Sequence, residues 1–261
     1  NSALAFIDTH EQPRRVRDFA LPLPLTVIGD LLGISAQDRA YFQRLAQYTL
    51  VPPTTLNILR IVPAMWALMR FVRQLLEQRR VSPQDDLLTA LVQVEAEGDR
   101  LTQDEQVAMV ILLLIAGHET TVNLITGGTL ALLEHPEQLA WLRAKPDQIK
   151  PAIEELLRFT NPVETSTERY ALEDITLHGT TIRRGDLVML ALASANRDAS
   201  QFARPDELDL SRQPNRHVAF GHGIHFCLGA PLARMEGQIA INQLLKRLPN
   251  QLSGGQRQRV A

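Results

Sequence analysis

The sequence is poor in cysteine and in net charge, and both shortages exclude classes of site. With one cysteine in 261 residues, the chain can form neither an internal disulfide nor a zinc site made of cysteines alone. A lone cysteine also suggests a reducing compartment. The net charge of −2 lacks the basic excess of nucleic-acid and anionic-membrane binders, so we expect neither kind of partner.

Long hydrophobic runs are lacking as well. The longest, from Val107 to Gly117, is too short to span a bilayer, and we expect it to form a buried helix. The first residues do not resemble a signal peptide. We therefore expect a cytoplasmic protein with no membrane partner. The chain begins with Asn1 instead of Met, and we expect it to be incomplete at this end.

The remaining composition, with 45% hydrophobic and 21% charged residues, is that of a globular protein. Helical periodicity predicts a helix over residues 64–80 and a long one from the capping box at Thr102–Glu105 to about Glu134. Further expected elements are helices over 26–32, after a proline-broken stretch at 21–25, and over 137–144, 151–159 and 228–248, a β-hairpin over 175–182 and a strand over 187–192. The fold class predicted is mainly α with a small β part.

The only cysteine, Cys227, lies in a stretch rich in glycine and histidine, His217 to Gly229 (HVAFGHGIHFCLG). It comes just before the last expected helix, whose N-terminal end favours a thiolate, and a thiolate is a metal ligand or a nucleophile. Three alternatives stay open: a buried structural cysteine, a nucleophile paired with His225, and a zinc site. The zinc ligands would be His217, His222, His225 and Cys227.

The segment Phe220–Gly229 matches the pattern F-x-x-G-x-x-x-C-x-G in full. It resembles the haem-binding loop of the cytochrome P-450 family. The resemblance implies that the Cys227 thiolate binds the iron of haem b. It also implies that the residues around it form the haem loop; these are Phe220, Gly221, Gly223 and Gly229.

A second motif interrupts the apolar run, at Ala116-Gly-His-Glu-Thr-Thr121. From the residues alone, it could be a helix end with a solvated turn. It is similar to the family's oxygen-binding motif, A/G-G-x-D/E-T-T. The resemblance implies that Glu119 and Thr120 deliver protons during activation of O2, the co-substrate, and that Ala116 and Gly117 flank the oxygen pocket.

A third motif, Glu155-Leu-Leu-Arg158, places opposite charges three residues apart on one helix face. The alternative is an exposed ion pair of little value. The motif resembles the family's E-x-x-R, with Arg212 as the third member. The resemblance gives these three residues a structural role in folding and in support of the haem loop.

Haem carries two propionates, which need cations or strong donors. The resemblance assigns them to Arg169 and His225, whereas Arg169 alone would pass for a surface arginine. It also implies that the segment after Asn161-Pro162 lines the substrate side of the pocket; the residues are Val163, Glu164 and Thr165.

The resemblance extends from about Pro22 to about Leu248. It implies a haem-thiolate monooxygenase that inserts one oxygen atom into a small organic substrate, with electrons from a ferredoxin-type donor. The expected organisation is a P-450-like domain over residues 1–250, incomplete at both ends. Two other functions stay open: a non-catalytic haem- or metal-binding fragment, and an ATPase partner suggested by the tail alone.

Residues 251–261 end in LSGGQRQRVA, which is similar to the signature segment of ABC-transporter ATPases. That segment binds nucleotide only across from a P-loop, and the sequence contains no G-x-x-x-x-G-K-[ST]. We therefore expect an unrelated or flexible tail.

Overall fold

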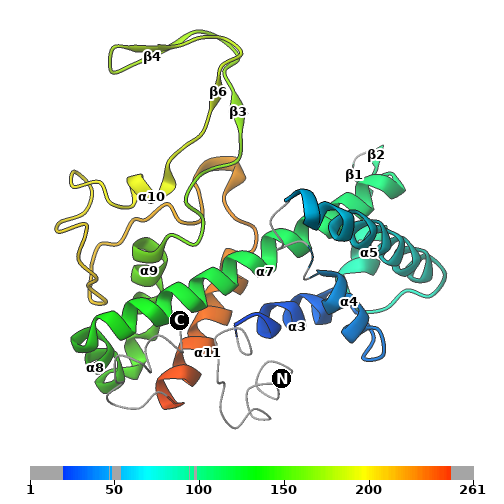
Figure 1. Cartoon of the computed structure of the whole chain (residues 1–261), viewed down its shortest axis with the longest axis horizontal. Coiled ribbons are helices and arrows are strands. Elements are labelled where there is room, and N and C mark those ends of the chain that lie inside the picture. The colour runs from blue at the N-terminus through cyan, green and yellow to red at the C-terminus, as the bar shows by residue number, and fades with distance from the viewer. Residues whose placement is uncertain (1–19, 47, 49–53, 94, 97–98, 248–261) are drawn as a thin grey trace. The chain divides into compact units, whose positions relative to one another are not determined.

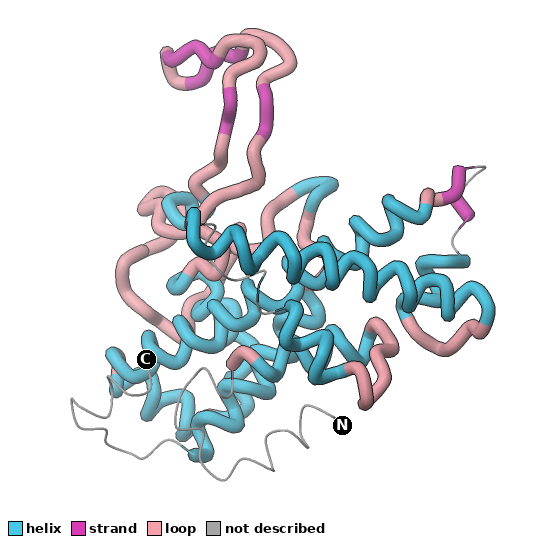
Figure 2. The backbone as a smooth tube through the Cα atoms, turned by 45° about the vertical axis from the view of Figure 1, so that its right-hand side comes forward, coloured by secondary structure: helices cyan, strands magenta, loops and turns pink. Residues whose placement is uncertain are grey.

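The chain is described here by a computed structural model that covers residues 20–46, 48, 54–93, 95–96 and 99–247 (Figure 1). Most of these residues are helical, and strands are few and short (Figure 2). The helices are α3 (Pro22–Leu31), α4 (Arg39–Ala46), α5 (Thr55–Val81), α6 (Leu87–Gln93), α7 (Gln103–Glu134), α8 (Pro136–Ala144), α9 (Ile149–Thr160), α10 (Leu192–Ala195) and α11 (Ala230–Arg247). The expected mainly α class is confirmed.

In the described part of the chain, six strands form three separate two-stranded antiparallel sheets. The strands are β1 (Glu95–Ala96), β2 (Asp99–Arg100), β3 (Arg169–Tyr170), β4 (Ile175–Leu177), β5 (Thr180–Ile182) and β6 (Leu187–Val188). The predicted hairpin over 175–182 is present as β4 and β5, in a register that pairs Ile175 with Ile182. The predicted strand over 187–192 is shorter than expected, because Leu190 pairs irregularly with Ser166 and Leu192 already begins α10.

The described residues fall into two compact units, 20–122 and 123–247, which are described separately. The division lies inside α7, so each unit contains part of that helix. Unit 1 contains α3 to α6 and the first part of α7. Unit 2 contains the remainder of α7, the helices α8 to α11 and the strands β3 to β6.

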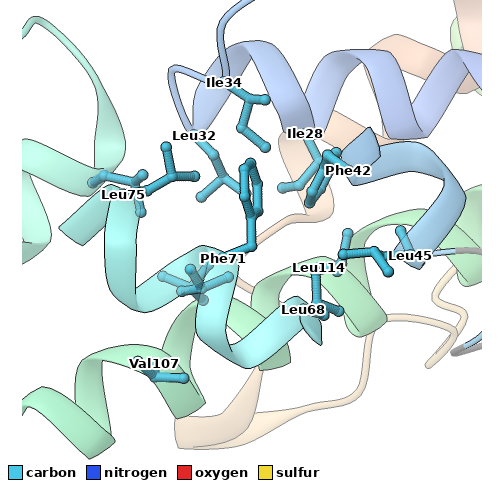
Figure 3. Close-up of a cluster of buried hydrophobic side chains, with 14 of the residues drawn as sticks. Ile28, Leu32, Ile34, Phe42, Leu45, Leu68, Phe71, Leu75, Val107 and Leu114 are labelled. Atoms are coloured by element: carbon cyan, nitrogen blue, oxygen red, sulfur yellow. The ribbon is translucent and has the colours of Figure 1, made fainter. Parts of the chain in front are cut away.

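Unit 1 is held together by a cluster of buried apolar side chains (Figure 3). Leu68 and Phe71 of α5 meet Phe42 of α4 and Ile28 of α3 in this cluster, and Leu114 of α7 joins them. Each such side chain stabilises the fold by about 1.5–3 kcal/mol when fully buried. The cluster therefore explains why these four helices pack side by side.

The first helix corrects one expectation from the sequence. We expect residues 21–25 to be a proline-broken approach to a helix over 26–32, but α3 begins at Pro22 and includes Pro24. The first four N–H groups of a helix have no partner within it, so a proline in the first turn loses no hydrogen bond. The helix predicted over 64–80 likewise begins earlier, at Thr55, and continues through Pro63.

The long helix α7 has the bounds predicted for it, and the capping box at its start is confirmed. Thr102 N donates to Glu105 Oε2 at 2.7 Å, and Glu105 N donates to Thr102 Oγ1 at 3.3 Å. By length and composition alone, α7 could cross a membrane, a test that a core helix of a soluble protein also passes. The apolar run Val107–Gly117 is thus only part of a helix that is apolar over a longer stretch.

In unit 2, α8, α9 and α11 form the helical part, and an arm of β-structure leaves it (Figure 1). β3 and β6 pair along the arm, and the β4–β5 hairpin lies at its tip. The helices α9 and α11 approach closely at Gly237, where an added Cβ would lie 3.5 Å from Ile153 of α9. The loop that contains Cys227 leads directly into α11.

Candidate haem-binding site

Cys227 lies in the loop formed by residues 217–229, here called the Cys loop. Its thiol is free and exposed. The backbone around it is fixed at both sides, because Cys227 N donates to Phe220 O at 3.0 Å and Ala230 N, the first residue of α11, donates to Cys227 O at 3.2 Å. The loop thus folds back on Phe220 and presents the thiol just ahead of the N-terminal end of a helix.

Two glycines give the Cys loop its course. Gly221 and Gly223 have φ of 73° and 79°, a left-handed conformation that other residues adopt only with strain. Gly229 needs no such conformation, and a Cβ added there would be in ordinary van der Waals contact with the sulfur of Cys227, at 3.9 Å. Gly221 and Gly223 therefore shape the chain on the N-terminal side of the thiol.

The loop geometry decides among the alternatives left open for Cys227. Its exposure contradicts a buried structural cysteine. The zinc site is wrong, because both ring nitrogens of His217 have other partners: Nε2 lies 3.1 Å from Glu154 Oε2, and Nδ1 accepts from Ala219 N at 3.2 Å. Among the described residues, no group of three or more His, Cys, Asp or Glu could hold a metal ion.

The residues of the Cys loop fit a haem. A haem needs a thiolate or similar axial ligand and an apolar surface against its ring. The loop offers the free thiol of Cys227 and three exposed apolar side chains next to it, Ile224, Phe226 and Leu228. Exposed apolar side chains in one loop are typical of a binding surface. Phe226 also packs edge-on against Phe220, with ring centroids 6.3 Å apart.

The two residues expected to bind propionates are both exposed. His225 ends the short 3-10 turn over Gly223–His225, and Arg169 begins β3, where it pairs with Val188 of β6. No hydrogen bond joins His225 to Cys227 in the described loop. The alternative of a Cys227 nucleophile paired with His225 therefore has no structural support. The predicted role of both residues at propionates stays a prediction.

Glu155 and Arg158 form a buried ion pair, with both side chains at 0% exposure. Arg158 donates to the two carboxylate oxygens from Nε and Nη2, at 2.8 Å each. The guanidinium of Arg212 adds Nε at 3.1 Å from both oxygens, and Asn215 Nδ2 lies 3.0 Å from Oε2. The alternative, that this motif is an exposed ion pair that adds little stability, is therefore wrong.

The cluster also fixes the irregular chain between α10 and the Cys loop. Arg158 Nη1 donates to the carbonyls of Asn196 and Pro205, at 2.9 and 2.7 Å. Arg212 Nη1 donates to Ala203 O at 2.6 Å. Residues 196–215 contain little regular structure, so these side-chain donors take the place of backbone ladders.

A second buried contact was missed from the sequence. Asn196, at 0% exposure, donates from Nδ2 to Asn161 Oδ1 at 2.8 Å and accepts at Oδ1 from Val218 N at 2.8 Å. Asn161 ends α9 in the left-handed conformation, with φ of 47°. One side chain thus ties the end of α9 to the Cys loop. An asparagine in a polar loop carries no periodic signal that would reveal this role.

The segment expected on the substrate side follows Asn161 directly. Val163 is half-buried, and Glu164 and Thr165 are exposed. Ala193 N donates to Glu164 O at 3.0 Å, and Thr165 forms an isolated β-bridge with Ala191. The segment is therefore held against Ala191 and the first turn of α10.

In unit 1, the motif at residues 116–121 lies inside an uninterrupted α7. The alternative, that this motif is a helix end with a solvated turn, is therefore wrong. Thr120 Oγ1 donates to Ala116 O at 2.9 Å, whereas the side chain of Glu119 is exposed. His118 is buried, donates from Nδ1 to Leu114 O at 2.7 Å, and burial lowers its pKa. The helix thus presents an acid and an alcohol at adjacent positions.

Comparison with known proteins agrees with this arrangement. The family model described as Cytochrome P450 matches residues 41–152 and 149–259. The chain is 45% identical over 235 residues to the polyketide biosynthesis cytochrome P450 PksS of Bacillus subtilis, covering 90% of this chain and 58% of that protein. It is 47% identical over 249 residues to the vitamin D(3) 25-hydroxylase of Pseudonocardia autotrophica, covering 94% and 60%.

A solved structure is similar over the same range. The crystal structure of P450BioI in complex with an acyl carrier protein that carries hexadec-9Z-enoic acid superposes with a TM-score of 0.85 at 41% identity, covering 95% of this chain and 65% of that one. The chain spans about three fifths of the length of the curated relatives it matches. The matched share of the sequence and the identity to these relatives together show that the chain belongs to the cytochrome P450 family.

Proposed function

We propose that this chain carries the haem-binding part of a monooxygenase that inserts one atom of O2 into a small organic substrate. Proteins of the family bind haem b and use O2 as co-substrate. The observation that carries the proposal is the free, exposed thiol of Cys227, on a loop whose backbone is fixed at Phe220 and Ala230. When bound, the haem supplies the activation of O2, and the protein supplies ligand, proton path and pocket.

The residues of unit 2 would hold the cofactor. Cys227 would hold the haem iron through its thiolate, and the apolar side chains of the Cys loop would pack against the ring. His225 and Arg169 bind the propionates through charge-assisted hydrogen bonds. Glu155, Arg158 and Arg212 support the loop through the buried cluster, and Val163, Glu164 and Thr165 contact the substrate.

The residues of α7 in unit 1 would move protons. Glu119 is exposed to solvent and takes up a proton, and the Thr120 hydroxyl passes it toward the reaction. Ala116 and Gly117 have the smallest side chains of this stretch and leave room for O2. The carbonyl of Ala116 accepts from Thr120, which sets the direction of that hydroxyl.

The partners and the location follow from the same proposal. The electron donor is a ferredoxin-type protein, and the protein acts in the cytoplasm without binding membrane or nucleic acid. The relatives' names refer to polyketide biosynthesis and to vitamin D(3), and P450BioI was solved with a fatty acid on an acyl carrier protein. Because these differ in chemistry, the substrate proposed here is a small organic molecule of no narrower class.

The domain organisation is also a proposal. Residues 1–250 form one haem-binding module in it, and residues 251–261 are a separate tail. The tail lies outside the described residues, as do residues 1–19.

The test is the absorption spectrum of the haem-reconstituted chain, reduced under carbon monoxide, beside Cys227→Ser. A red-shifted Soret band that the mutant loses would support thiolate ligation. Turnover with a supplied electron donor then separates the monooxygenase from a haem protein without catalysis. If the chain binds haem with thiolate ligation but never forms product, the alternative of a non-catalytic haem-binding fragment replaces the proposal.

The proton path has its own test. In Glu119→Gln and Thr120→Ala, electron use should continue while product formation falls, because O2 is reduced without delivery of the protons in the right order. Coupling as tight as in the parent would show that these two residues do not carry the protons.

A further inference from the structure

A charged cluster at the start of the Cys loop contains two residues, Glu154 and Arg234, that have no part in the function proposed above. It consists of Glu154, Arg234, His217 and Phe220, and is called the Glu154 cluster below. Arg234, on the second turn of α11, donates from Nε and Nη2 to the two carboxylate oxygens of Glu154, at 2.7 and 2.8 Å. His217 Nε2 lies 3.1 Å from Glu154 Oε2. One carboxylate of α9 thus holds both α11 and the start of the Cys loop.

The cluster reaches Cys227 through Phe220. The guanidinium of Arg234 lies over the Phe220 ring, 4.6 Å from its centroid. The carbonyl of the same residue, Phe220, accepts the hydrogen bond from Cys227 N at 3.0 Å. Arg234 thus stacks on the residue whose carbonyl holds the backbone of Cys227. Glu154 fixes Arg234 in this position.

The hydrogen bonds leave little freedom for these side chains. In the tautomer with its proton on Nε2, His217 donates to Glu154 while Nδ1 accepts from Ala219 N. The His217 side chain is 4% exposed, and those of Glu154 and Arg234 are about two thirds buried or more. Bidentate arginine–carboxylate pairs hold one geometry, so the charges beside the Cys loop have defined positions.

We propose that Arg234 and Glu154 set the electrostatic potential at Cys227, and through it the reduction potential of the haem that this thiolate binds. The proposal rests on the proposed function. A cation near an iron–thiolate centre favours the reduced state, which carries one more negative charge, and a nearby anion opposes it. Arg234 therefore raises the reduction potential, and the carboxylate of Glu154 limits that effect.

The protonation equilibria of the cluster agree with the geometry. The hydrogen bonds to Glu154 raise the pKa of Arg234 against the effect of burial, and the charges of Glu154 and of Cys227 raise it further. The guanidinium of Arg234 therefore stays a fixed positive charge beside the Phe220 ring.

The charge hypothesis predicts shifts of opposite sign, which a merely structural role would not. Glu154→Gln removes the anion and should move the midpoint potential upward. Arg234→Gln removes the cation and should move it downward. Glu154→Asp and Arg234→Lys keep the charges and should stay near the parent. The matched control is Asp206→Asn, which removes the same charge from the exposed pair with Arg197 and should leave the potential unchanged.

The experiment first records the ferrous carbon monoxide spectrum of each haem-reconstituted chain and then titrates its midpoint potential with a reductant and mediator dyes. Opposite shifts in Glu154→Gln and Arg234→Gln, with a thiolate-type spectrum in both, support the inference. Shifts in the same direction, or none, overturn it while the proposed function stands. If Glu154→Gln does not fold, the contrast between Arg234→Gln and Arg234→Lys decides. A parent chain without the thiolate spectrum overturns the proposed function and this inference with it.

Discussion

The side chain of Asn196 holds the backbone of Val218, whose N–H donates to Asn196 Oδ1 at 2.8 Å. Asn196 is fully buried, and its Nδ2 donates to Asn161 at the end of α9. A loop without regular structure cannot hold its own course, because its backbone groups lack ladder partners. The Cys loop therefore depends on side chains that come from other segments.

The first prediction concerns this contact. Asn196→Ala leaves the Val218 N–H and Asn161 Oδ1 without these partners, and buried groups left unsatisfied cost about 1–3 kcal/mol each. We expect a lower free energy of unfolding in guanidinium, and a smaller thiolate-type fraction in the carbon monoxide spectrum. Gln201→Ala is the control, because its exposed amide contacts only neighbouring Ser200. The same free energy of unfolding and the same carbon monoxide spectrum in both variants would show that Asn196 does not support the loop.

The second prediction tests the buried ion pair of α9. Glu155→Ala leaves Arg158 and Arg212 as buried, unpaired cations, and breaking a buried pair in this way costs about 3–5 kcal/mol. Glu207→Ala breaks the Arg204–Glu207 pair, which has the same spacing but is exposed, and should cost less than about 1 kcal/mol. Chemical denaturation measures both. Similar losses would mean that burial of the Glu155–Arg158 pair has no energetic consequence.

The third prediction concerns Gly33 in unit 1. Its φ is +65°, and a Cβ added there would lie 2.0 Å from Asp86 Oδ2. Asp86 forms a buried ion pair with Arg79, whose Nη2 donates to Gly33 O at 2.7 Å. Gly33→Ala should therefore displace a buried pair, at a cost of about 3 kcal/mol or more.

The matched control for Gly33→Ala is Gly179→Ala. Gly179 has φ of +80°, with no atom within 4 Å of an added Cβ, so its replacement adds backbone strain alone, about 1–2 kcal/mol. Thermal unfolding of the two variants separates strain from displacement. A smaller loss at Gly33 than at Gly179 would contradict the steric role of Asp86.

The fourth prediction is a pH dependence of stability at Glu154. Burial alone would raise the pKa of Glu154, but hydrogen bonds from His217 and Arg234, together with the charge of Arg234, lower it from 4.5 to about 2. A lowered carboxylate pKa stabilises the fold above the unfolded value, and this contribution is lost as the pH falls from about 4.5 toward 2. Because the Glu154 side chain is partly exposed, solvent screening keeps its contribution below about 1.4 kcal/mol per pKa unit.

The measurement is the free energy of unfolding of the parent and of Glu154→Gln across this pH range. The parent should be more stable above pH 4.5, and the two should converge toward pH 2, because the amide that replaces the carboxylate does not titrate. A constant difference at every pH would show that the ionisation of Glu154 does not contribute to stability.

Much of the fold and part of the site follow from local sequence. The bounds of α7 follow from its capping box and apolar run, and the β4–β5 hairpin follows from strand residues on both sides of His178-Gly179. The position of Cys227 ahead of α11 follows from the helical pattern after it. In each case the signal lies within a few consecutive residues, since helix caps and turns are made by near neighbours.

The prolines of α3 show where local sequence no longer predicts the structure. A proline near a helix start is compatible with a break and with a first turn, and the two cannot be told apart from the dipeptide pattern. Packing of α3 against the apolar cluster of unit 1 decides for the helix. The early start of α5, ahead of Pro63, likewise could not be predicted from the proline alone.

The sequence by itself determined which residues are candidates: a lone cysteine in a glycine-rich loop and an acid–alcohol pair in a long helix for the chemistry, and an E-x-x-R motif for structural support. Only the tertiary structure decided that Glu155 and Arg158 are buried, that Cys227 is exposed and that His217 binds Glu154 instead of a metal. The contacts behind these outcomes join residues far apart in the chain, 57 positions for Glu155 and Arg212 and 80 for Glu154 and Arg234. Periodicity and caps report only neighbours along the chain, so pairings of this length arise when the helices pack.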